Sequence, residues 1–290
     1  MLRISELTKT YSNGVQALKN VSLEIPPGMF GLLGANGAGK TTLMKIAATL
    51  LEADSGKAEL DGINLIKDKP ACRRLLGYLP QEFGLYPSLT AEQTLDYLAK
   101  LKGVVNKQER RTLVGALLER VNLAEYRKQR VGTFSGGMKQ RLGIAQTLIG
   151  QPRLLIVDEP TAGLDPEERV RFHNLLVEMV DADTVVILST HIVSDVSNLC
   201  GQMAIIRKGE IIASCTPVAA TTKLKGSIWE ALVTQAQIDS LPASCKVIST
   251  HRFDGRVRLR VFSKSGPPTE AFTIATPTLE DHYFTVSREL

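Results

Sequence analysis

The sequence lacks long hydrophobic runs and any sign of a secretory signal. Among its 290 residues, no apolar run approaches the roughly 18 residues that a membrane-spanning helix needs. The N-terminal segment MLRISELTKTYSNG has no apolar core of the kind that directs secretion. We therefore expect the chain to stay in the cytoplasm, so that any work at a membrane depends on another chain that crosses it.

Cysteine pairs and concentrated charge are also missing. The four cysteines form no CxxC pair, and we interpret them as small buried residues in a reducing compartment: Cys72, Cys200, Cys215 and Cys245. The net charge is only +5, and the basic residues are spread along the chain. This pattern indicates a solvated surface rather than a nucleic-acid-binding stripe, although the sign would suit an anionic ligand or a membrane surface.

What the sequence does contain is an alternation of strand and helix patterns. Strand-like runs fill residues 1–33, and helical patterns dominate residues 85–150. Beyond them, the apolar runs RLLIVDEP and TVVILSTH flank a helical stretch, as expected of parallel strands buried on both faces. The alternation predicts an α/β fold with the helical block as an insertion.

The pattern changes twice toward the C-terminus. We expect residues 1–215 to form the main domain, because small and polar residues replace the periodic pattern at residues 216–226 and indicate a linker. The pattern of residues 227–290 predicts a small α/β accessory domain. Its clearest element is a hairpin, with a turn at Asp254-Gly255 and apolar residues that alternate along the second strand.

A glycine-rich loop follows the third strand-like run. Residues 34–41, GANGAGKT, match G-x-x-x-x-G-K-[ST] and lie between a predicted strand and a predicted helix. The glycines allow a tight turn in which N–H groups wrap a β-phosphate, Lys40 neutralises phosphate charge, and the Thr41 hydroxyl can ligate Mg²⁺. An accidental glycine-rich turn is the alternative, and the strand–loop–helix context argues against it. The loop predicts a nucleotide site.

Two acidic residues end the run LLIVDE at residues 154–159. A buried carboxylate is costly unless it is paired, so Asp158 and Glu159 need a specific reason to be there. Beside a phosphate-binding loop, Asp158 would hold Mg²⁺ through its water shell and Glu159 would orient the attacking water. A helix-capping acid would account for either residue alone but poorly for both.

A second anion-binding element occurs about 100 residues after the first. Ser135, Gly136 and Gly137 precede the amphipathic helical run MKQRLGIAQTLIG. At a helix start, free N–H groups and the helix dipole attract negative charge. The spacing of the two elements gives no reason why one chain needs both.

Three further residues are uninformative when each is considered alone. His191 fits a structural histidine at a strand end, Gln81 an exposed loop residue, and Tyr11 a strand aromatic in the core. Together with the motifs above, their order resembles the nucleotide-binding subunit of ABC transporters over about 210 residues. The resemblance implies a P-loop NTPase of the ABC type, with its ATPase domain at residues 1–215, an antiparallel β subdomain, and a helical subdomain at about residues 85–150.

The resemblance also implies roles for individual residues. The ring of Tyr11 would stack on adenine, Gln81 would touch Mg²⁺ and relay the state of the site to the helical subdomain, and His191 would reach the γ-phosphate. The residues implied in nucleotide binding are Tyr11, Gly34, Ala35, Asn36, Gly37, Ala38, Gly39, Lys40, Thr41, Thr42, Ser135, Gly136 and Gly137. Those implied in Mg²⁺ binding are Thr41, Gln81 and Asp158, and those implied in catalysis are Glu159, His191 and Gln81.

The second anion-binding element fits the family signature, with departures at its ends. The signature usually reads LSGGQ, whereas Phe134 and Met138 flank the intact Ser-Gly-Gly here. Ala35 and Ala162 stand where the family often has proline and serine. Cassettes of this family pair head to tail, so the resemblance implies that the Ser-Gly-Gly helix of one chain covers the ATP held by its partner. The second element would then serve the partner's nucleotide.

The implied function is ATP hydrolysis that energises transport by transmembrane permease subunits, at the cytoplasmic face of the cell membrane. ATP and Mg²⁺ are the implied cofactors. A homodimer is the expected pairing, with a heterodimer left open. The ending TLEDHYFTV, residues 278–286, resembles that of the exporter branch and favours export, and a terminal helix capped by Thr278 is the alternative interpretation. The transported substrate stays open, because its contacts belong to the membrane chains.

Two other functions fit the sequence less well. A soluble ABC ATPase that acts on nucleic acid or ribosomes usually carries two cassettes, long coiled-coil insertions or zinc-binding cysteine pairs, and this sequence has none of them. We therefore expect no nucleic-acid partner. The stretch Asn106-Lys107-Gln108-Glu109 resembles the N-K-x-D motif of GTPases, but it has Glu in place of Asp and follows no strand pattern.

Overall fold

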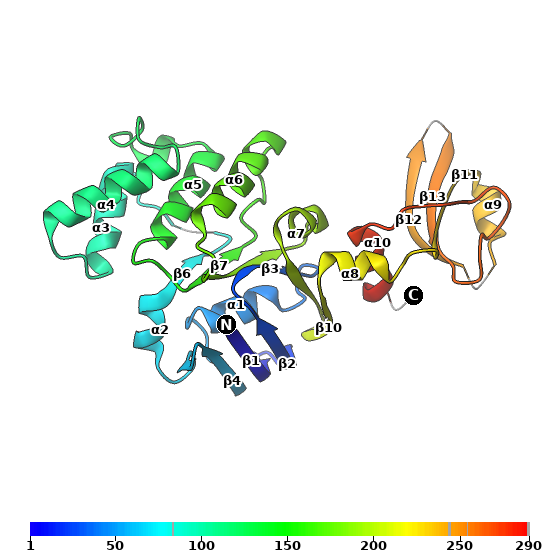
Figure 1. The fold of residues 1–290 in the computed structure, drawn as a ribbon, viewed down its shortest axis with the longest axis horizontal. Helices are drawn as coiled ribbons and strands as arrows, with labels where there is room; N and C mark the ends of the chain where they lie inside the picture. Colours follow the sequence, from blue (N-terminus) through cyan, green and yellow to red (C-terminus); the bar gives the residue numbers. More distant parts are fainter. Residues whose placement is uncertain (83, 243–244, 254, 289–290) are drawn as a thin grey trace.

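The computed structural model describes residues 1–82, 84–242, 245–253 and 255–288. Figure 1 shows a larger body of sheets and helices at one end of the molecule and a small sheet at the other, with α8 (Pro217–Thr222) and α10 (Leu279–Ser287) between them. Among the described residues, no helix is both long enough and apolar enough to cross a lipid bilayer.

A six-stranded sheet forms the centre of the larger body. Its order is β10-β9-β3-β8-β7-β6, and all neighbours are parallel except β9 and β10. The strands are β3 (Gly28–Leu33), β6 (Leu76–Leu79), β7 (Leu154–Asp158), β8 (Val185–Thr190), β9 (Gln202–Arg207) and β10 (Glu210–Cys215). Every residue of β7 and β8 is buried, as predicted for parallel strands covered on both faces. The carboxyl ends of β3, β7 and β8 meet at one edge, which brings together the segments that follow them.

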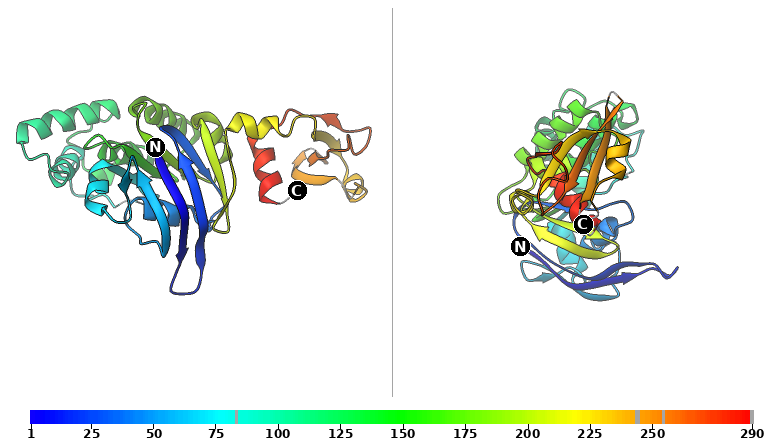
Figure 2. Two further views of the ribbon diagram at one scale, coloured as in Figure 1. Left: turned by 60° about the horizontal axis from the view of Figure 1, so that its bottom comes forward. Right: turned by 90° about the vertical axis from the view of Figure 1, so that its right-hand side faces the viewer.

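An antiparallel sheet of order β2-β1-β4-β5 forms a second layer. It comprises β1 (Leu2–Thr10), β2 (Gln16–Ile25), β4 (Ser55–Leu60) and β5 (Ile63–Asn64). Figure 2 shows β1 and β2 as a long hairpin that projects from the body. Helix α1 (Lys40–Ala47) shares one apolar core with both sheets through Leu43, Met44 and Ile46. The helix after the glycine-rich loop is therefore fixed on both sides.

Helices cover the other face of the central sheet. The helices whose buried residues join the apolar cluster on this face are α3 (Ala91–Leu101), α4 (Lys107–Arg120), a 3₁₀ turn (Val131–Thr133), α5 (Gly136–Thr147), α6 (Pro166–Met179) and α7 (Val193–Leu199). Helix α2 (Lys69–Leu75) instead places Cys72 in the core that contains α1. The predicted helical block holds α3, α4 and α5, whose N-cap residues Thr90, Asn106 and Ser135 each accept a hydrogen bond from the first turn. Asn106 thus serves as a helix cap, which accounts for the stretch that resembles a GTPase motif.

The C-terminal sheet is antiparallel, with the order β12-β13-β11-β14. Its elements are β11 (Ile228–Val233), α9 (Gln235–Asp239), β12 (Lys246–Phe253), β13 (Arg256–Phe262) and β14 (Thr273–Ile274). Strands β12 and β13 form the predicted hairpin, and the alternating Val257, Leu259 and Val261 are buried on one face. In the predicted turn, Asp254 lies outside the described residues and Gly255 has a φ of 72°.

Two helices join the larger body to the C-terminal sheet. The predicted linker at residues 216–226 contains α8, which Thr216 caps. Helix α10 begins after Thr278, in a capping box with Asp281, and packs against α7 and α8. Its Leu279 and Tyr283 join the same apolar cluster as α7. The last helix therefore contacts the larger body, while the domain limits at residues 215 and 227 stay predictions.

Candidate nucleotide-binding site

The glycine-rich loop connects β3 to α1 and is enclosed by neighbouring backbone. A Cβ on Gly34 would lie 2.5 Å from the Ile206 carbonyl oxygen, and a Cβ on Gly39, whose φ is 109°, would lie 2.5 Å from that of Ala17. Only glycine fits either position. Within the described part of the loop, Gly34 and Ala38 are the residues whose N–H groups donate to another backbone carbonyl. The other N–H groups, together with the positive end of the α1 dipole, are available to an anion.

Lys40 lies beneath the loop with only 4% of its side chain exposed. Its Nζ donates to the carbonyl oxygens of Gly34 at 2.7 Å and Ala35 at 3.2 Å, and it lies 3.1 Å from Glu159 Oε1. A buried ammonium group needs such partners, because removing an unpaired charge from water is costly. The carboxylate of Glu159 supplies the negative charge that Lys40 requires.

Glu159 also contacts His191, through its second carboxylate oxygen. The distance from Glu159 Oε2 to His191 Nδ1 is 3.1 Å. Glu159 has a φ of 47°, a left-handed conformation that costs energy in a residue other than glycine. The side chain of His191 is 44% exposed, so it can meet a ligand that enters from solvent.

Asp158 is buried, and its carboxylate has no hydrogen-bond partner among the described residues. Burial raises the pKa of Asp158, and the nearby hydroxyls of Ser189 and Thr41 offset this only in part. The Ser189 hydroxyl is likewise without a partner in the described part of the chain. A carboxylate and hydroxyls that lack partners are the oxygen ligands a hard divalent cation prefers. The residues present therefore fit Mg²⁺, held by few protein groups together with phosphate and water.

The loop opens into a cavity of about 580 Å³. The predicted site residues that line it are Tyr11, Ala35, Asn36, Gly37, Gly39, Lys40, Thr41, Thr42, Gln81 and Glu159. Tyr11 is 38% exposed, and its hydroxyl lies 3.1 Å from Thr42 Oγ1, which holds the ring at the rim. The remaining predicted residues near the loop, Gly34, Ala38, Asp158 and His191, lie outside the lining.

The cavity has further lining residues that the sequence did not predict: Val15, Gln16, Ala17, Lys19, Lys208 and Gly209. They come from the β1–β2 hairpin and the β9–β10 turn. Gly209 N donates to Ala38 O at 2.9 Å, so the turn rests on the glycine-rich loop. The only sequence signal was the Lys-Gly pair between two strand patterns, and nothing in that pair places the turn beside the loop.

The second anion-binding element lies outside this cavity. Ser135 caps α5, and its Oγ accepts a hydrogen bond from Met138 N at 3.2 Å. Gly136 is exposed and lines a neighbouring hollow together with Gln81. A Cβ on Gly137 would lie 2.1 Å from Glu168 Oε2, so the side chain of Glu168 on α6 packs directly against Gly137. Ser135, Gly136 and Gly137 therefore lie outside the lining of the loop cavity of the same chain.

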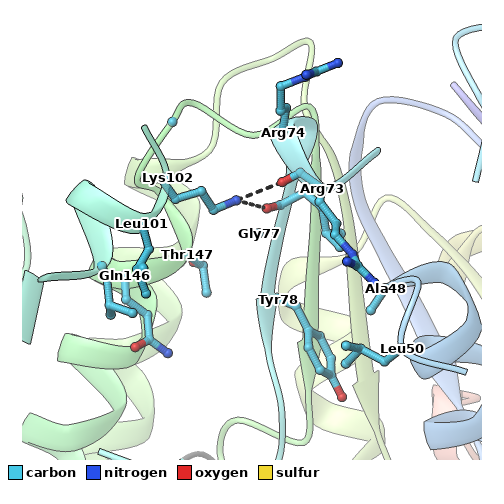
Figure 3. Close-up of a pocket in the computed structure, with 13 residues that line it drawn as sticks. Ala48, Leu50, Arg73, Arg74, Gly77, Tyr78, Leu101, Lys102, Gln146 and Thr147 are labelled. Carbon is cyan, nitrogen blue, oxygen red and sulfur yellow. Dashed lines mark hydrogen bonds between the residues drawn. The ribbon is translucent and has the colours of Figure 1, made fainter. Parts of the chain in front are cut away.

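A separate groove of about 760 Å³ lies between the end of α1, strand β6 and the helical block (Figure 3). Lys102 reaches across it, and its Nζ donates to the carbonyl oxygens of Arg73 at 3.0 Å and Leu76 at 2.8 Å. Leu50 and Leu101 are well exposed on this surface. The groove thus combines exposed apolar side chains with basic residues.

A phosphate-binding loop at the carboxyl ends of a parallel sheet, with a buried acidic pair beside it, defines a P-loop ATPase. The family model described as ABC transporter matches residues 18–162, and the chain belongs to this family. It is 34% identical over 300 residues to the uncharacterized ABC transporter ATP-binding protein YxlF of Bacillus subtilis (strain 168), with 99% of each chain covered. The linearmycin resistance ATP-binding protein LnrL of the same organism is 35% identical over 227 residues, which cover 78% of this chain and 72% of LnrL.

A solved structure supports the same assignment. The dimeric, post-hydrolysis state of the ATP-binding cassette MJ0796, bound to ADP and Pi, matches with a TM-score of 0.67 and 28% identity. The match covers 74% of this chain and 98% of that cassette. The family and the P-loop fold predicted from the motifs are therefore confirmed. The protein is an ABC ATPase, the ATP-binding subunit of a transporter.

Proposed function

We propose that this ATPase drives export through partner transmembrane chains, with Mg-ATP bound in the loop cavity and Glu159 and His191 as catalytic residues. The observation that carries the proposal is the series of contacts from Lys40 through Glu159 to His191. A phosphate group that enters the loop competes with Glu159 for Lys40. The carboxylate of Glu159 is then free to orient a water molecule, while His191 stays beside it.

The cavity suits an adenine nucleotide in its charge and shape. The N–H groups of the loop and the ammonium groups of Lys40, Lys19 and Lys208 complement a triphosphate. The half-exposed ring of Tyr11 at the rim provides a face on which a base can stack. The phosphates therefore enter at the loop and the base lies toward the β1–β2 hairpin.

Thr41 and Asp158 would hold Mg²⁺, and Gln81 would complete the protein ligands from the other wall of the cavity. When bound, the ion supplies positive charge that stabilises the phosphoryl group being transferred. The support for this part is the buried Asp158 carboxylate, whose oxygens have no other partner in the described chain.

Several observations support a membrane partner, a dimer and export. The exposed Leu50 and Leu101 line one groove together with Arg73 and Arg74, and this groove offers a surface for an amphipathic, acidic segment of a transmembrane chain (Figure 3). Attachment to a membrane would then come through that chain. LnrL is named for resistance to linearmycin, which favours export, and MJ0796 is dimeric, which favours a homodimer with Ser135 facing the partner's nucleotide. We assign residues 1–215 to the ATPase domain and residues 227–290 to an accessory domain.

The proposal is tested with purified protein and two substitutions. Lys40→Ala weakens ATP binding, because the loop loses its buried cation. Glu159→Gln keeps ATP binding but lowers turnover by about 100-fold or more, because only the water-orienting carboxylate is lost. ATP affinity is measured by nucleotide titration and turnover by phosphate release.

Glu24→Gln is the matched control, because Glu24 forms an exposed ion pair with Arg3 on the antiparallel sheet. It leaves both ATP affinity and turnover unchanged. Turnover of the Glu159→Gln protein close to that of the unsubstituted protein would show that Glu159 is not the catalytic carboxylate. The membrane assignment requires that ATP turnover respond to a co-purified transmembrane chain, and that Leu101→Asp abolish the association.

A further inference from the structure

Asp195 lies on α7, has none of its surface exposed, and does not line the loop cavity. Its Oδ2 accepts hydrogen bonds from Thr161 Oγ1 at 2.8 Å and Thr190 Oγ1 at 3.3 Å. Its Oδ1 accepts from Arg169 Nε at 2.8 Å, and Arg169 Nη2 makes a further short contact with it. One buried carboxylate therefore connects α6, α7, the end of β8 and the loop that follows β7.

The surroundings of Asp195 keep it ionised. Burial alone would raise the pKa of Asp195, but the nearby His173 and the hydrogen bonds from Arg169 and Thr161 outweigh it and hold the pKa below its ordinary value. His173 Nε2 lies 3.1 Å from Oδ1. Because Arg169 compensates the charge, the carboxylate can remain an acceptor for both threonine hydroxyls in a site closed to water.

The two threonines adjoin the proposed catalytic residues. Thr161 follows Glu159 by two residues, and Thr190 directly precedes His191. Both threonines are almost fully buried, and Thr190 Oγ1 also accepts a hydrogen bond from Ile192 N at 2.9 Å. The backbone on each side of the Glu159–His191 contact is therefore tied to the same anion. The left-handed Glu159 needs such support, because a strained conformation persists only where its surroundings determine it.

We propose that Asp195 is a positioning residue for ATP hydrolysis, which fixes the separation of Glu159 and His191 through the hydroxyls of Thr161 and Thr190. The proposal rests on the catalytic roles proposed above for Glu159 and His191. Asp195 itself touches neither the nucleotide cavity nor either catalytic side chain. Its effect therefore falls on the geometry of the catalytic pair, and hence on kcat rather than on ATP binding.

The test replaces each hydroxyl without changing the shape of the side chain. Thr161→Val and Thr190→Val each remove one hydrogen bond to Asp195, and each lowers kcat by about 10-fold while ATP affinity and KM stay within twofold. Thr161→Ser and Thr190→Ser keep the hydroxyl and restore kcat. The double valine variant loses less than the product of the single losses, because both hydroxyls act through one carboxylate.

Thr184→Val is the matched control. Thr184 lies at the opposite end of β8 from Thr190, is also buried, and places its hydroxyl 3.4 Å from Pro152 O. Thr184→Val changes the melting temperature by about as much as the other valine substitutions do, but it leaves kcat unchanged. The comparison separates a general packing defect from misplacement of the catalytic pair.

Three results would overturn the proposal. They are kcat within twofold of normal in both folded valine variants, an equal loss of kcat in Thr184→Val, or no recovery in the serine variants. Failure of the proposed function looks different, because Glu159→Gln and His191→Ala would then leave turnover intact in the otherwise unsubstituted protein.

Discussion

At the scale of single residues, Asp158, the proposed Mg²⁺ ligand, carries a cost in stability. Its buried carboxylate has no partner in the described chain, and burial raises its pKa. Asp158→Asn removes the buried charge at constant size, so we expect it to raise the free energy of unfolding without metal by on the order of 1 kcal/mol. The same substitution abolishes Mg²⁺-dependent ATP turnover. Thermal melts in the presence of a chelator, together with phosphate-release assays, check both outcomes.

The pH dependence of this effect follows from the direction of the pKa shift. A raised folded-state pKa means that the folded protein holds the proton more tightly than the unfolded chain. Stability is then highest below the unfolded pKa and falls as the pH rises through the folded pKa. The advantage of Asp158→Asn is therefore largest at neutral pH and shrinks in acid. An advantage that grows toward acid would contradict the assignment.

Asp195 provides the matched control, because it is equally buried but well paired. Its folded-state pKa is lowered, so its contribution to stability is present above the unfolded pKa and is lost as the pH falls through the folded pKa. Asp195→Asn therefore destabilises the protein at neutral pH, by about 3 kcal/mol, and the difference disappears in acid. At neutral pH, the two substitutions should therefore change the free energy of unfolding in opposite directions.

At the residue level, the sequence motifs selected side chains that the structure places close together, while their roles stay predictions. Lys40 and Glu159 were identified from their spacing, and the structure brings them within 3.1 Å of each other. Lys208 and Asp195 were missed for a physical reason. Their surroundings depend on which distant segments of the chain they meet, and neither has a local pattern that differs from an ordinary turn lysine or helix aspartate.

At the scale of elements, the β9–β10 turn supports the glycine-rich loop. Gly209 has a φ of 84°, and a Cβ there would lie 2.8 Å from the Ala17 carbonyl oxygen. Because Gly209 N also donates to Ala38 O, a shift of this turn moves the loop. We expect Gly209→Ala to lower both the melting temperature and the affinity for ATP, as measured by thermal melts and nucleotide titration.

Gly62 is the control for backbone strain alone. It has a φ of 85°, but a Cβ there meets nothing within 4 Å. Gly62→Ala carries the left-handed penalty of about 1–2 kcal/mol and no collision, so it lowers the melting temperature without changing ATP affinity. Equal ATP affinities in the two variants would show that the turn does not position the loop.

Prediction of elements worked where periodicity was strong and failed where packing decides. The alternating pattern of the C-terminal hairpin identified its buried face, and the apolar runs identified the parallel strands β7 and β8. Residues 216–226 gave no such signal, yet they contain α8. This short helix is stabilised by the Thr216 cap and by Ala220, which is buried in an apolar cluster. Because the other members of that cluster are distant in the sequence, the local pattern does not reveal the helix.

At the scale of the whole molecule, the chain returns to the ATPase body at its end. Helix α10 is tied to the C-terminal sheet by the ion pair of Asp281 with Arg260 and to the larger body by the hydrogen bond from Arg207 Nη1 to Ser287 O. It also packs on α7, the helix that carries Asp195. Helix α10 therefore connects the C-terminal sheet to α7, the helix that follows His191 in the chain.

The separation of the glycine-rich loop from the Ser-Gly-Gly element leads to a prediction about assembly. Ser135 lies outside the cavity that contains Lys40, so the proposed dimer places Ser135 against the partner's nucleotide. A mixed dimer is made from one chain that carries Ser135→Arg and another that carries Lys40→Ala. Both chains also carry Glu159→Gln, which prevents turnover. If the sites are shared, that dimer contains one doubly damaged site and one intact site. If each chain serves its own ATP, both sites are damaged.

We expect the mixed dimer to trap about one ATP, whereas either single-variant homodimer traps little, because the arginine side chain fills the space meant for the γ-phosphate. Trapped nucleotide is counted by rapid filtration, and crosslinking verifies that mixed dimers have formed. The matched control replaces Ser135→Arg by Thr133→Arg, at an exposed position just before the N-cap of α5. With both sites of that dimer carrying an intact Ser135, only the site that lacks Lys40 is impaired. The Ser135→Arg mixture could instead trap no more ATP than the separate homodimers, although crosslinked mixed dimers are present. That result would mean that both elements contact the same nucleotide within one chain, or that the two elements contact no nucleotide.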